Sequence, residues 1–192
     1  MRKIIVSEFI TLDGIMDDPG GADQTKHGGW SFQYWNNQAQ KYKYDELFAS
    51  DALLLGRITY EGFSAAWPSM TDEDGFAERM NGLPKYVVSE TLDHLEWNNS
   101  KLIKGNVIEE ISKLKQESGQ DIVIHGSGAL INSLLKHNII DEFRLMVFPI
   151  VLGSGKRLFK EIDVMNHLKF LEAKTFETGV IVLHYELEKT NT

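Results

Sequence analysis

Two stretches of this sequence place small and polar residues directly after an apolar strand, where they could hold a phosphate group. In LLLGRITYEGF (53–63), three leucines are followed by Gly56, Arg57 and Thr59. Glycine allows a ligand to approach the main chain, a guanidinium pairs with phosphate through two N–H donors, and a threonine hydroxyl can donate to a phosphate oxygen. The stretch predicts one wall of an anion site; the alternative is a solvated arginine after a strand.

The second stretch is DIVIHGSGALINSLLKH (121–137), in which an apolar strand passes through Gly126, Ser127 and Gly128 into an amphipathic helix. Free N–H groups at a helix start, with the positive end of the helix dipole, favour an anion, and Ser127 can cap the helix. The alternative is a tight turn without a ligand. A third strand, in KYVVSET (85–91), ends at Ser89. Because parallel strands end at the same edge of a sheet, we expect one crevice there.

Several other chemistries are excluded by what the sequence lacks. It contains no cysteine, which excludes disulfides, thiolate catalysis and cysteine-based zinc sites, and its six histidines lack metal-ligand spacing, so no metal site is expected. The P-loop motif GxxxxGK[ST] is missing, and Ile131 replaces the third glycine of the Rossmann fingerprint. The net charge of −8 argues against a general nucleic-acid binder.

The chain of 192 residues is expected to form a single domain, 1–192, because no repeat, low-complexity tract or linker divides it. Its 42% hydrophobic and 25% charged residues are typical of a soluble globular protein. Glu8 interrupts the apolar run of MRKIIVSEFI too early for a signal peptide or a membrane span. We therefore expect a cytoplasmic protein that does not bind membranes.

Alternating strand and helix patterns organise the residues named above. Strands rich in β-branched and aromatic residues are expected at 3–10, 52–55, 85–88, 122–125, 142–151, 168–176 and 180–188. Helices are expected at 33–49, 74–81, 107–116 and 129–137. This order predicts a mainly parallel sheet with helices on its faces, and the last two strands, joined by ETG, predict an antiparallel hairpin. Pro149 predicts a bulge or an edge within its strand.

The stretches LLLGRITYEGF, KYVVSETL, IVIHGSGALINSLL and IDEFRLMVFPIVLGSGKRLF occur in the order found in the dihydrofolate reductase-like superfamily, which the sequence resembles over nearly its whole length. The opening SEFITLDGIMDD makes it most similar to the branch containing the reductase domain of bacterial riboflavin biosynthesis proteins. The resemblance implies a dihydrofolate reductase-like three-layer α/β fold, a stand-alone member of this branch, and a reductase that uses NADPH.

The resemblance also implies roles for individual residues. Those matching the NADPH site are Gly56, Arg57, Thr59, Ser89, Gly126, Ser127, Gly128 and Ala129, with Arg57 facing the adenosine 2′-phosphate and the glycine turn facing the pyrophosphate. Asp13, in the loop ITLDGIMDD, matches an Asp–Gly pair of the family and is the candidate catalytic residue. It could bind substrate or position a proton donor, or simply form a turn.

Four further residues are candidates for binding the acceptor substrate. Trp35 could stack on a planar ring or pack at the rim of the site, and Gly153 and Gly155 could form a second anion site or a plain loop. Gln40 stands where dihydrofolate reductases carry a carboxylate, and Asp45 and Glu46 lie about a turn and a half further along the helix, too far to replace it. This departure puts folate reduction in doubt.

Three functions are therefore open. The first is an NADPH-dependent reductase of the 5-amino-6-(5-phosphoribosylamino)uracil type, and the second is a reductase of another small acceptor, folate included. The third is an NADPH-binding sensor or regulator without turnover.

His125 could contact substrate or cofactor, or be a buried core histidine. The resemblance and the apolar C-terminal strands predict a homodimer; the sequence does not identify the acceptor.

Overall fold

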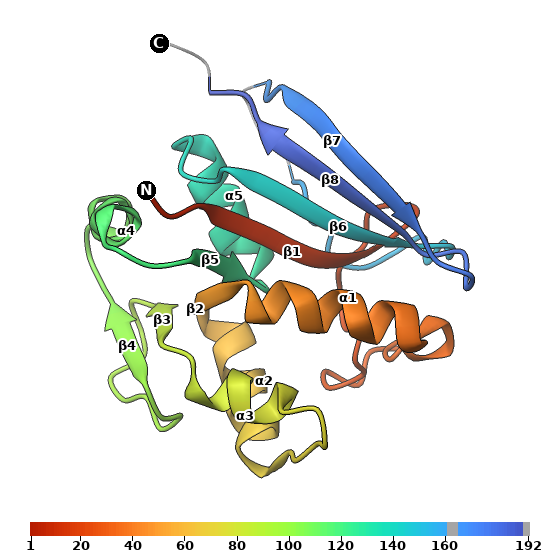
Figure 1. Cartoon of the computed structure of the whole chain (residues 1–192), viewed down its shortest axis with the longest axis horizontal. Helices are drawn as coiled ribbons and strands as arrows, with labels where there is room; N and C mark the ends of the chain where they lie inside the picture. The colour runs from red at the N-terminus through yellow and green to blue at the C-terminus, as the bar shows by residue number, and fades with distance from the viewer. Residues whose placement is uncertain (161–164, 190–192) are drawn as a thin grey trace.

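One eight-stranded sheet runs through the computed structural model, which describes residues 1–160 and 165–189 (Figure 1). The strand order is β4-β3-β2-β5-β1-β6-β8-β7. The strands are β1 (Ile4–Thr11), β2 (Ser50–Gly56), β3 (Lys85–Val88), β4 (Ser100–Ile103), β5 (Asp121–Ile124), β6 (Glu142–Phe148), β7 (Leu168–Thr175) and β8 (Ile181–Leu187). The helices are α1 (Asn37–Phe48), α2 (Arg57–Ala66), α3 (Phe76–Gly82), α4 (Val107–Gln116) and α5 (Gly128–Lys136).

The predicted fold class is confirmed. The six strands from β4 to β6 in the sheet order are all parallel, and β8 pairs antiparallel with both β6 and β7. Because all six parallel strands end at the same edge, the segments that follow β1, β2, β3 and β5 gather there. That edge is where the residues of the predicted site lie.

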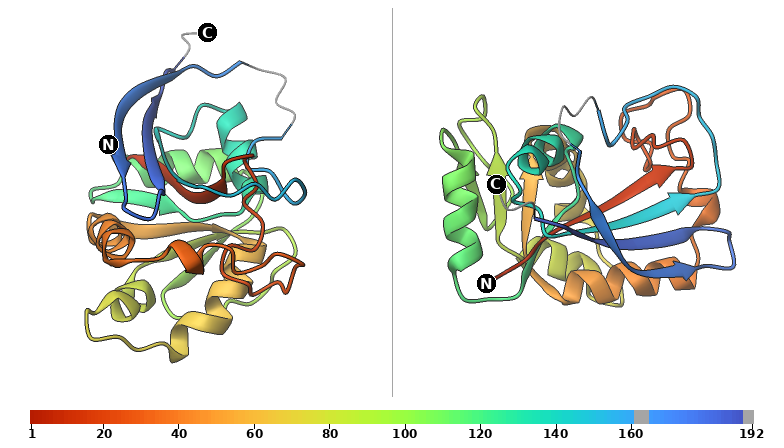
Figure 2. Two further views of the ribbon diagram at one scale, coloured as in Figure 1. Left: turned by 90° about the vertical axis from the view of Figure 1, so that its right-hand side faces the viewer. Right: turned by 90° about the horizontal axis from the view of Figure 1, so that it is seen from above.

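Helices cover both faces of the sheet, as the views in Figure 2 show. Successive residues of a strand point to opposite faces, so Leu54 and Ile124 pack with α4 and α5 while Leu53 and Val123 pack with α1, α2 and α3. The result is the three-layer arrangement that the sequence predicts. Among the described residues, no helix is long and apolar enough to cross a lipid bilayer.

Several predicted element boundaries were wrong. The helix expected at 33–49 begins only at Asn37, because the Asn36 side chain accepts a hydrogen bond from the Ala39 N–H and caps it; a short 3₁₀ turn, Phe32–Tyr34, precedes it. The strand expected at 142–151 ends at Phe148, so Pro149, which lacks an N–H, follows the strand instead of bending it. Strand β4 was not predicted, since only one of its four residues is buried.

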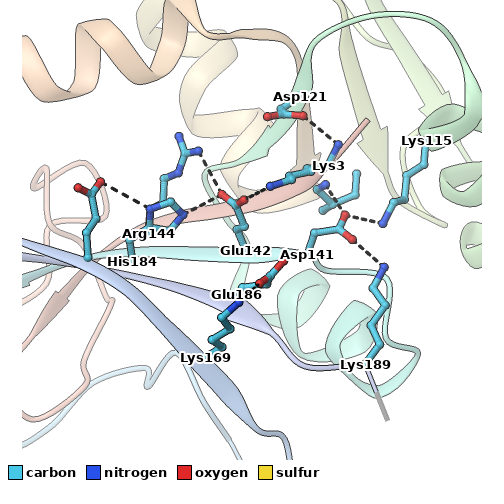
Figure 3. A network of polar contacts seen from close by, with 12 residues as sticks. Lys3, Lys115, Asp121, Asp141, Glu142, Arg144, Lys169, His184, Glu186 and Lys189 are labelled. Carbon is cyan, nitrogen blue, oxygen red and sulfur yellow. Dashed lines mark hydrogen bonds and ion pairs between the residues drawn. The ribbon is translucent and has the colours of Figure 1, made fainter. Parts of the chain in front are cut away.

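Two acidic residues fasten the C-terminal strands at the amino end of the parallel sheet (Figure 3). Glu142 of β6 pairs with Lys3, the residue before β1, and accepts a hydrogen bond of 2.8 Å from Nε2 of His184 on β8. Burial alone would raise the pKa of Glu142, but its bonds to Lys3 and His184 and the charge of Arg144 lower it to about 2. Asp141 pairs with two further lysines. This network lies at the opposite end of β1 from the predicted site.

Candidate functional site

The β2–α2 junction and the glycine turn after β5 are packed against each other. The Gly56 N–H donates to the Gly126 carbonyl oxygen at 3.1 Å. A Cβ on Gly56 would lie 2.4 Å from Ser127 Oγ, and one on Gly126 would lie 2.5 Å from Thr59 Oγ1. Both glycines are therefore required for the mutual approach of the two segments, and four of the predicted cofactor residues lie together as a result.

Two helices begin side by side at this contact. Gly56 precedes α2, and Ser127 caps α5 with its Oγ accepting from the Leu130 N–H at 3.4 Å. The first-turn N–H groups of Gly128 and Ala129 have no acceptor within the helix. Neither helix has an acidic residue in its first turn. The positive ends of two helix dipoles thus converge without a neutralising carboxylate, which favours an anion.

Arg57 and Ser89 lie next to this pair of helix starts. Arg57 is the first residue of α2; its side chain is 44% exposed and forms a pair of 2.9 Å with Glu61. Such an exposed pair contributes little, so the guanidinium can change partner at low cost. Gly56 pairs with Val88 across the sheet, so Ser89 follows alongside Arg57. The Ser89 hydroxyl accepts from the N–H groups of the next turn, at 3.0 and 3.2 Å.

Asp13 ties the loop after β1 to the loop after β6. Its carboxylate accepts hydrogen bonds from Thr11 Oγ1 at 2.6 Å, from the Gly153 N–H at 2.8 Å and from the Leu152 N–H at 3.3 Å. A Cβ on Gly155 would lie 2.7 Å from Ile15, so the loops also pack closely. The bond from Thr11, followed by those from the loop, lowers the pKa of Asp13. At neutral pH Asp13 is an acceptor without a proton to give, and its catalytic role stays a prediction.

This pair of loops reaches the glycine turn through Met16. A Cβ on Gly128 would lie 2.7 Å from the Met16 sulfur. Asp13, Gly153 and Gly155 are therefore brought together, next to the start of α5.

Trp35 and Gln40 occupy different surroundings. Trp35 is 40% exposed and its ring lies 5.8 Å from that of Phe9 on β1. Gln40 is exposed on the outer side of α1, where its side-chain N–H donates to Asp74 at 2.9 Å. The structure does not bring Gln40 to the glycine turn, and the substrate role of both residues stays a prediction. Trp30 is buried in the core.

A buried polar cluster, which sequence reasoning missed, links α1 to β1 and β5. Ser7 Oγ donates to Glu46 at 2.7 Å, and Lys43 donates to Ser7 at 2.7 Å and pairs with Glu46. His125 Nδ1 lies 3.2 Å from the Ser7 carbonyl oxygen; since that oxygen only accepts, the proton belongs on Nδ1. Burial and the charge of Lys43 lower the pKa of His125 to about 4. His125 is therefore neutral at pH 7.

Glu46, which is expected to lie too far along the helix to replace the carboxylate of dihydrofolate reductases, is buried next to Ser7 of β1, and its inability to bind substrate stays a prediction. Burial alone would raise its pKa, but the charge of Lys43 and the hydrogen bonds from Lys43 and Ser7 keep that pKa below its usual value. Glu46 is thus a buried carboxylate that reaches the middle of β1, whereas Asp45 is exposed and pairs with Lys41. The signal was present in the sequence, because Lys43 and Glu46 share helical spacing with the buried Ala39 and Leu47.

Within the described residues, no group of three or more acidic or histidine side chains is placed to hold a metal ion. The anion-favouring surface is thus made of helix starts, hydroxyls and Arg57. On one side it is flanked by the buried polar cluster, and on the other by the loops after β1 and β6 that Asp13 joins (the Asp13 loops).

Comparisons with known proteins find similar sequences and folds. The family model of the RibD C-terminal domain matches residues 2–182. Two uncharacterized Bacillus subtilis proteins are similar along their length: YyaP is 31% identical over 96% of this chain and 94% of its own, and YwjB is 29% identical over 96% and 97%.

Solved structures share the fold. A putative riboflavin biosynthesis protein from Shewanella sp. PV-4 superposes with a TM-score of 0.76 at 23% identity, covering 97% of this chain and 99% of that one. A Thermotoga maritima protein, described as a diaminohydroxyphosphoribosylaminopyrimidine deaminase/5-amino-6-(5-phosphoribosylamino)uracil reductase, gives a TM-score of 0.65 at 13% identity; this chain, 97% covered, spans 56% of it.

Proposed function

Because this chain belongs to the RibD C-terminal domain family, we propose that it is an NADPH-dependent oxidoreductase acting on a small acceptor. The observation that carries the proposal is the convergence of two helix starts, free of acidic residues, beside Arg57. A dinucleotide with a pyrophosphate and a 2′-phosphate requires such a set of N–H, hydroxyl and guanidinium donors. The donor set of this chain therefore fits NADPH.

NADPH, when bound, supplies the hydride. The N–H groups of α5, with Ser127, would hold the pyrophosphate, and Arg57, Thr59 and Ser89 would hold the adenosine phosphate. The Asp13 loops would limit the access of water and position the acceptor. The buried pair of Lys43 and Glu46, bonded to Ser7 of β1, would add fixed charges to the electrostatic field of the site without contacting the acceptor.

We propose an acceptor of the 5-amino-6-(5-phosphoribosylamino)uracil type, since the Thermotoga maritima protein is described by that reduction. Another small carbonyl or imine compound, or dihydrofolate, is the alternative. We place this reaction in the cytoplasm, where the NADPH pool is found.

The proposal is tested by two measurements on the purified protein. Calorimetry should show NADPH binding, and NADPH absorbance should fall when an acceptor is added from a panel of the phosphoribosylaminopyrimidine, dihydrofolate, and small aldehydes and imines. Tight NADPH binding without oxidation across the panel would instead favour a sensor or regulator. An absence of binding would contradict both functions.

Arg57→Ala is expected to raise the Kd of NADPH about 10- to 100-fold, because a charge-assisted, two-pronged contact with a phosphate is worth roughly 1.5–3 kcal/mol. The Kd of NADH, which lacks the 2′-phosphate, should change by less than about threefold. Both are measured by quenching of protein fluorescence. Glu61→Ala is the control, since it removes the partner of Arg57 and leaves the cation. Equal weakening of both nucleotides would show that Arg57 does not contact the 2′-phosphate.

We also propose that two copies associate through β7. This strand forms the edge of the sheet, and its side chains, among them Leu168, Phe170 and Leu171, are all exposed. Exposed apolar edges of this kind favour pairing with another chain. Light scattering at micromolar concentration should give the mass of a dimer, and Phe170→Glu should give a monomer. Met70→Glu, an exposed position on another face, should leave the dimer intact.

A further inference from the structure

Glu8 is a buried carboxyl group on an otherwise apolar face of β1. It is 7% exposed, and its neighbours on that face, Val6 and Ile10, belong to the hydrophobic core. Across the sheet it stands beside Leu145 of β6, also buried. Its Oε1 has no hydrogen-bond partner among the described residues. An unpartnered buried polar group costs stability, so the fold itself gives no reason to keep a carboxyl here.

The register of the sheet places Glu8 beside the glycine turn. The last pair between β1 and β5 is Val6 with Ile124, and the contact of His125 with the Ser7 carbonyl extends this alignment by one residue. Glu8 is the next residue of β1, and continuing the same register would bring it level with Gly126. Beyond this point β1 continues next to β6 alone, so its other edge has no strand among the described residues.

The charged groups around Glu8 come from α1 and from the neighbouring strands. Lys43 and Glu46 act on it from α1; His125 at the end of β5 is neutral, and Arg144 of β6 lies level with Ser7. The only charged residue of α5, Lys136, is at its far end. Burial raises the pKa of Glu8 to about 8, Lys43 opposes this rise and Glu46 adds to it. At pH 7 most of the Glu8 carboxyl therefore carries a proton.

We propose that Glu8 is the proton donor of the reduction, a role that rests on the proposed function. As the hydride adds to the carbon of a C=O or C=N group, the π electron pair moves onto the oxygen or nitrogen, which takes the proton from Glu8. The carboxylate then regains a proton from water, so each turnover consumes one hydride and one solvent proton. General acids contribute most when their proton is available near the working pH.

The other titratable groups near the glycine turn do not have such a proton. Asp13 is ionised and accepts three hydrogen bonds, and neutral His125 uses its Nδ1 proton on Ser7. Lys43 is paired with Glu46. Glu8 combines a transferable proton with an Oε1 atom that has no hydrogen-bond partner within the part of the chain that the structure describes.

Two variants test the proposal in the full-length protein. Glu8→Gln keeps the shape but has no acidic proton, and Glu8→Leu matches the apolar surroundings. With 5-amino-6-(5-phosphoribosylamino)uracil as acceptor, both should lower kcat by about 100-fold or more at pH 7 while the Kd of NADPH changes less than about threefold. In the wild type kcat should fall as pH rises through about 8, and the residual activity of the variants should lack this fall. Glu96→Gln, an exposed glutamate, is the matched control.

Two further readouts do not depend on turnover. Infrared spectroscopy at pH 7 should show the C=O band of a protonated carboxyl group that is missing in Glu8→Gln and is perturbed by NADP⁺. Glu8→Leu should unfold at a higher denaturant concentration than the wild type, because it removes a buried group without a partner. A purely structural role would lower that midpoint instead.

The outcomes separate the two proposals. No oxidation of NADPH by the wild type with any acceptor overturns the proposed function, and the role of Glu8 with it. Turnover with an unchanged rate and pH profile in Glu8→Gln overturns only the role of Glu8. Loss of NADPH binding in Glu8→Gln, or destabilisation by Glu8→Leu, also overturns it and assigns Glu8 to cofactor binding or to the fold.

Discussion

Gly56→Ala is expected to raise the Kd of NADPH by about 100-fold or more, although it adds one methyl group. The added Cβ would lie 2.4 Å from Ser127 Oγ and 3.0 Å from the Ser127 main-chain nitrogen. The backbone of Gly56 is extended, with φ −77°, so alanine meets no conformational penalty there, and the effect comes from the clash alone. To relieve the clash, the α2 start must move away from the glycine turn, which separates the two sets of N–H donors. Calorimetry with NADPH measures the loss.

Two other variants check this interpretation. Gly62→Ala lies on the same helix, and a Cβ there meets nothing within 4 Å. It should leave NADPH binding unchanged and stabilise the protein by up to about 1 kcal/mol, since alanine favours helix. Adding Ser127→Gly to Gly56→Ala removes the hydroxyl and Cβ that clash, and should recover part of the affinity. Wild-type affinity in Gly56→Ala would mean that the close approach of the two segments is not needed for the cofactor.

Lys85→Ala is expected to lower the free energy of unfolding by roughly 3–5 kcal/mol. Lys85 is completely buried at the start of β3. Its ammonium donates to three main-chain carbonyl oxygens, those of Asn81 at 2.6 Å, Leu83 at 2.8 Å and Asn98 at 3.1 Å, and lies 4.2 Å from the Trp97 ring centroid. The alanine variant leaves these oxygens without a donor and opens a cavity. Urea denaturation measures the change.

A control variant and the pH dependence of stability check the same interpretation of Lys85. Lys101→Ala, at an exposed position on β4, should change stability by less than about 0.5 kcal/mol. Burial lowers the pKa of Lys85 to about 8 from 10.5. The unfolded chain therefore binds more protons between these values, and the stability of the wild type relative to Lys85→Met should rise as pH increases from 8 to 10.5. A Lys85→Ala protein as stable as the wild type would show that these bonds contribute nothing.

The fold was predictable because its signals are local and repeated. Apolar runs such as LLLG and IVIH, each followed by an amphipathic helix, indicate parallel strands, and the alternation around ETG indicates the hairpin. Strand β4 was not predictable in this way, because its pairing with β3 supplies the order that its own residues do not.

The candidate site was predictable where the residue type itself indicates a role, as it does for a glycine, serine or arginine directly after a strand. Gly56, Ser127 and Arg57 were identified by their position after strands, and the structure brings their segments together. The glycines, however, serve the packing of one segment on the other. The burial of Glu8 and Glu46 was not predicted, because the surroundings of a charged residue are set only when the sheet and helices assemble.

The bonds of Asp13 have a consequence for how an acceptor enters. They join positions 13 and 153, which are 140 residues apart in the chain. The loop after β1 cannot shift without breaking these bonds or carrying the loop after β6 with it. The loops after β1 and β6 should therefore move together, and substitutions around Gly153 should alter that movement as much as substitutions around Asp13.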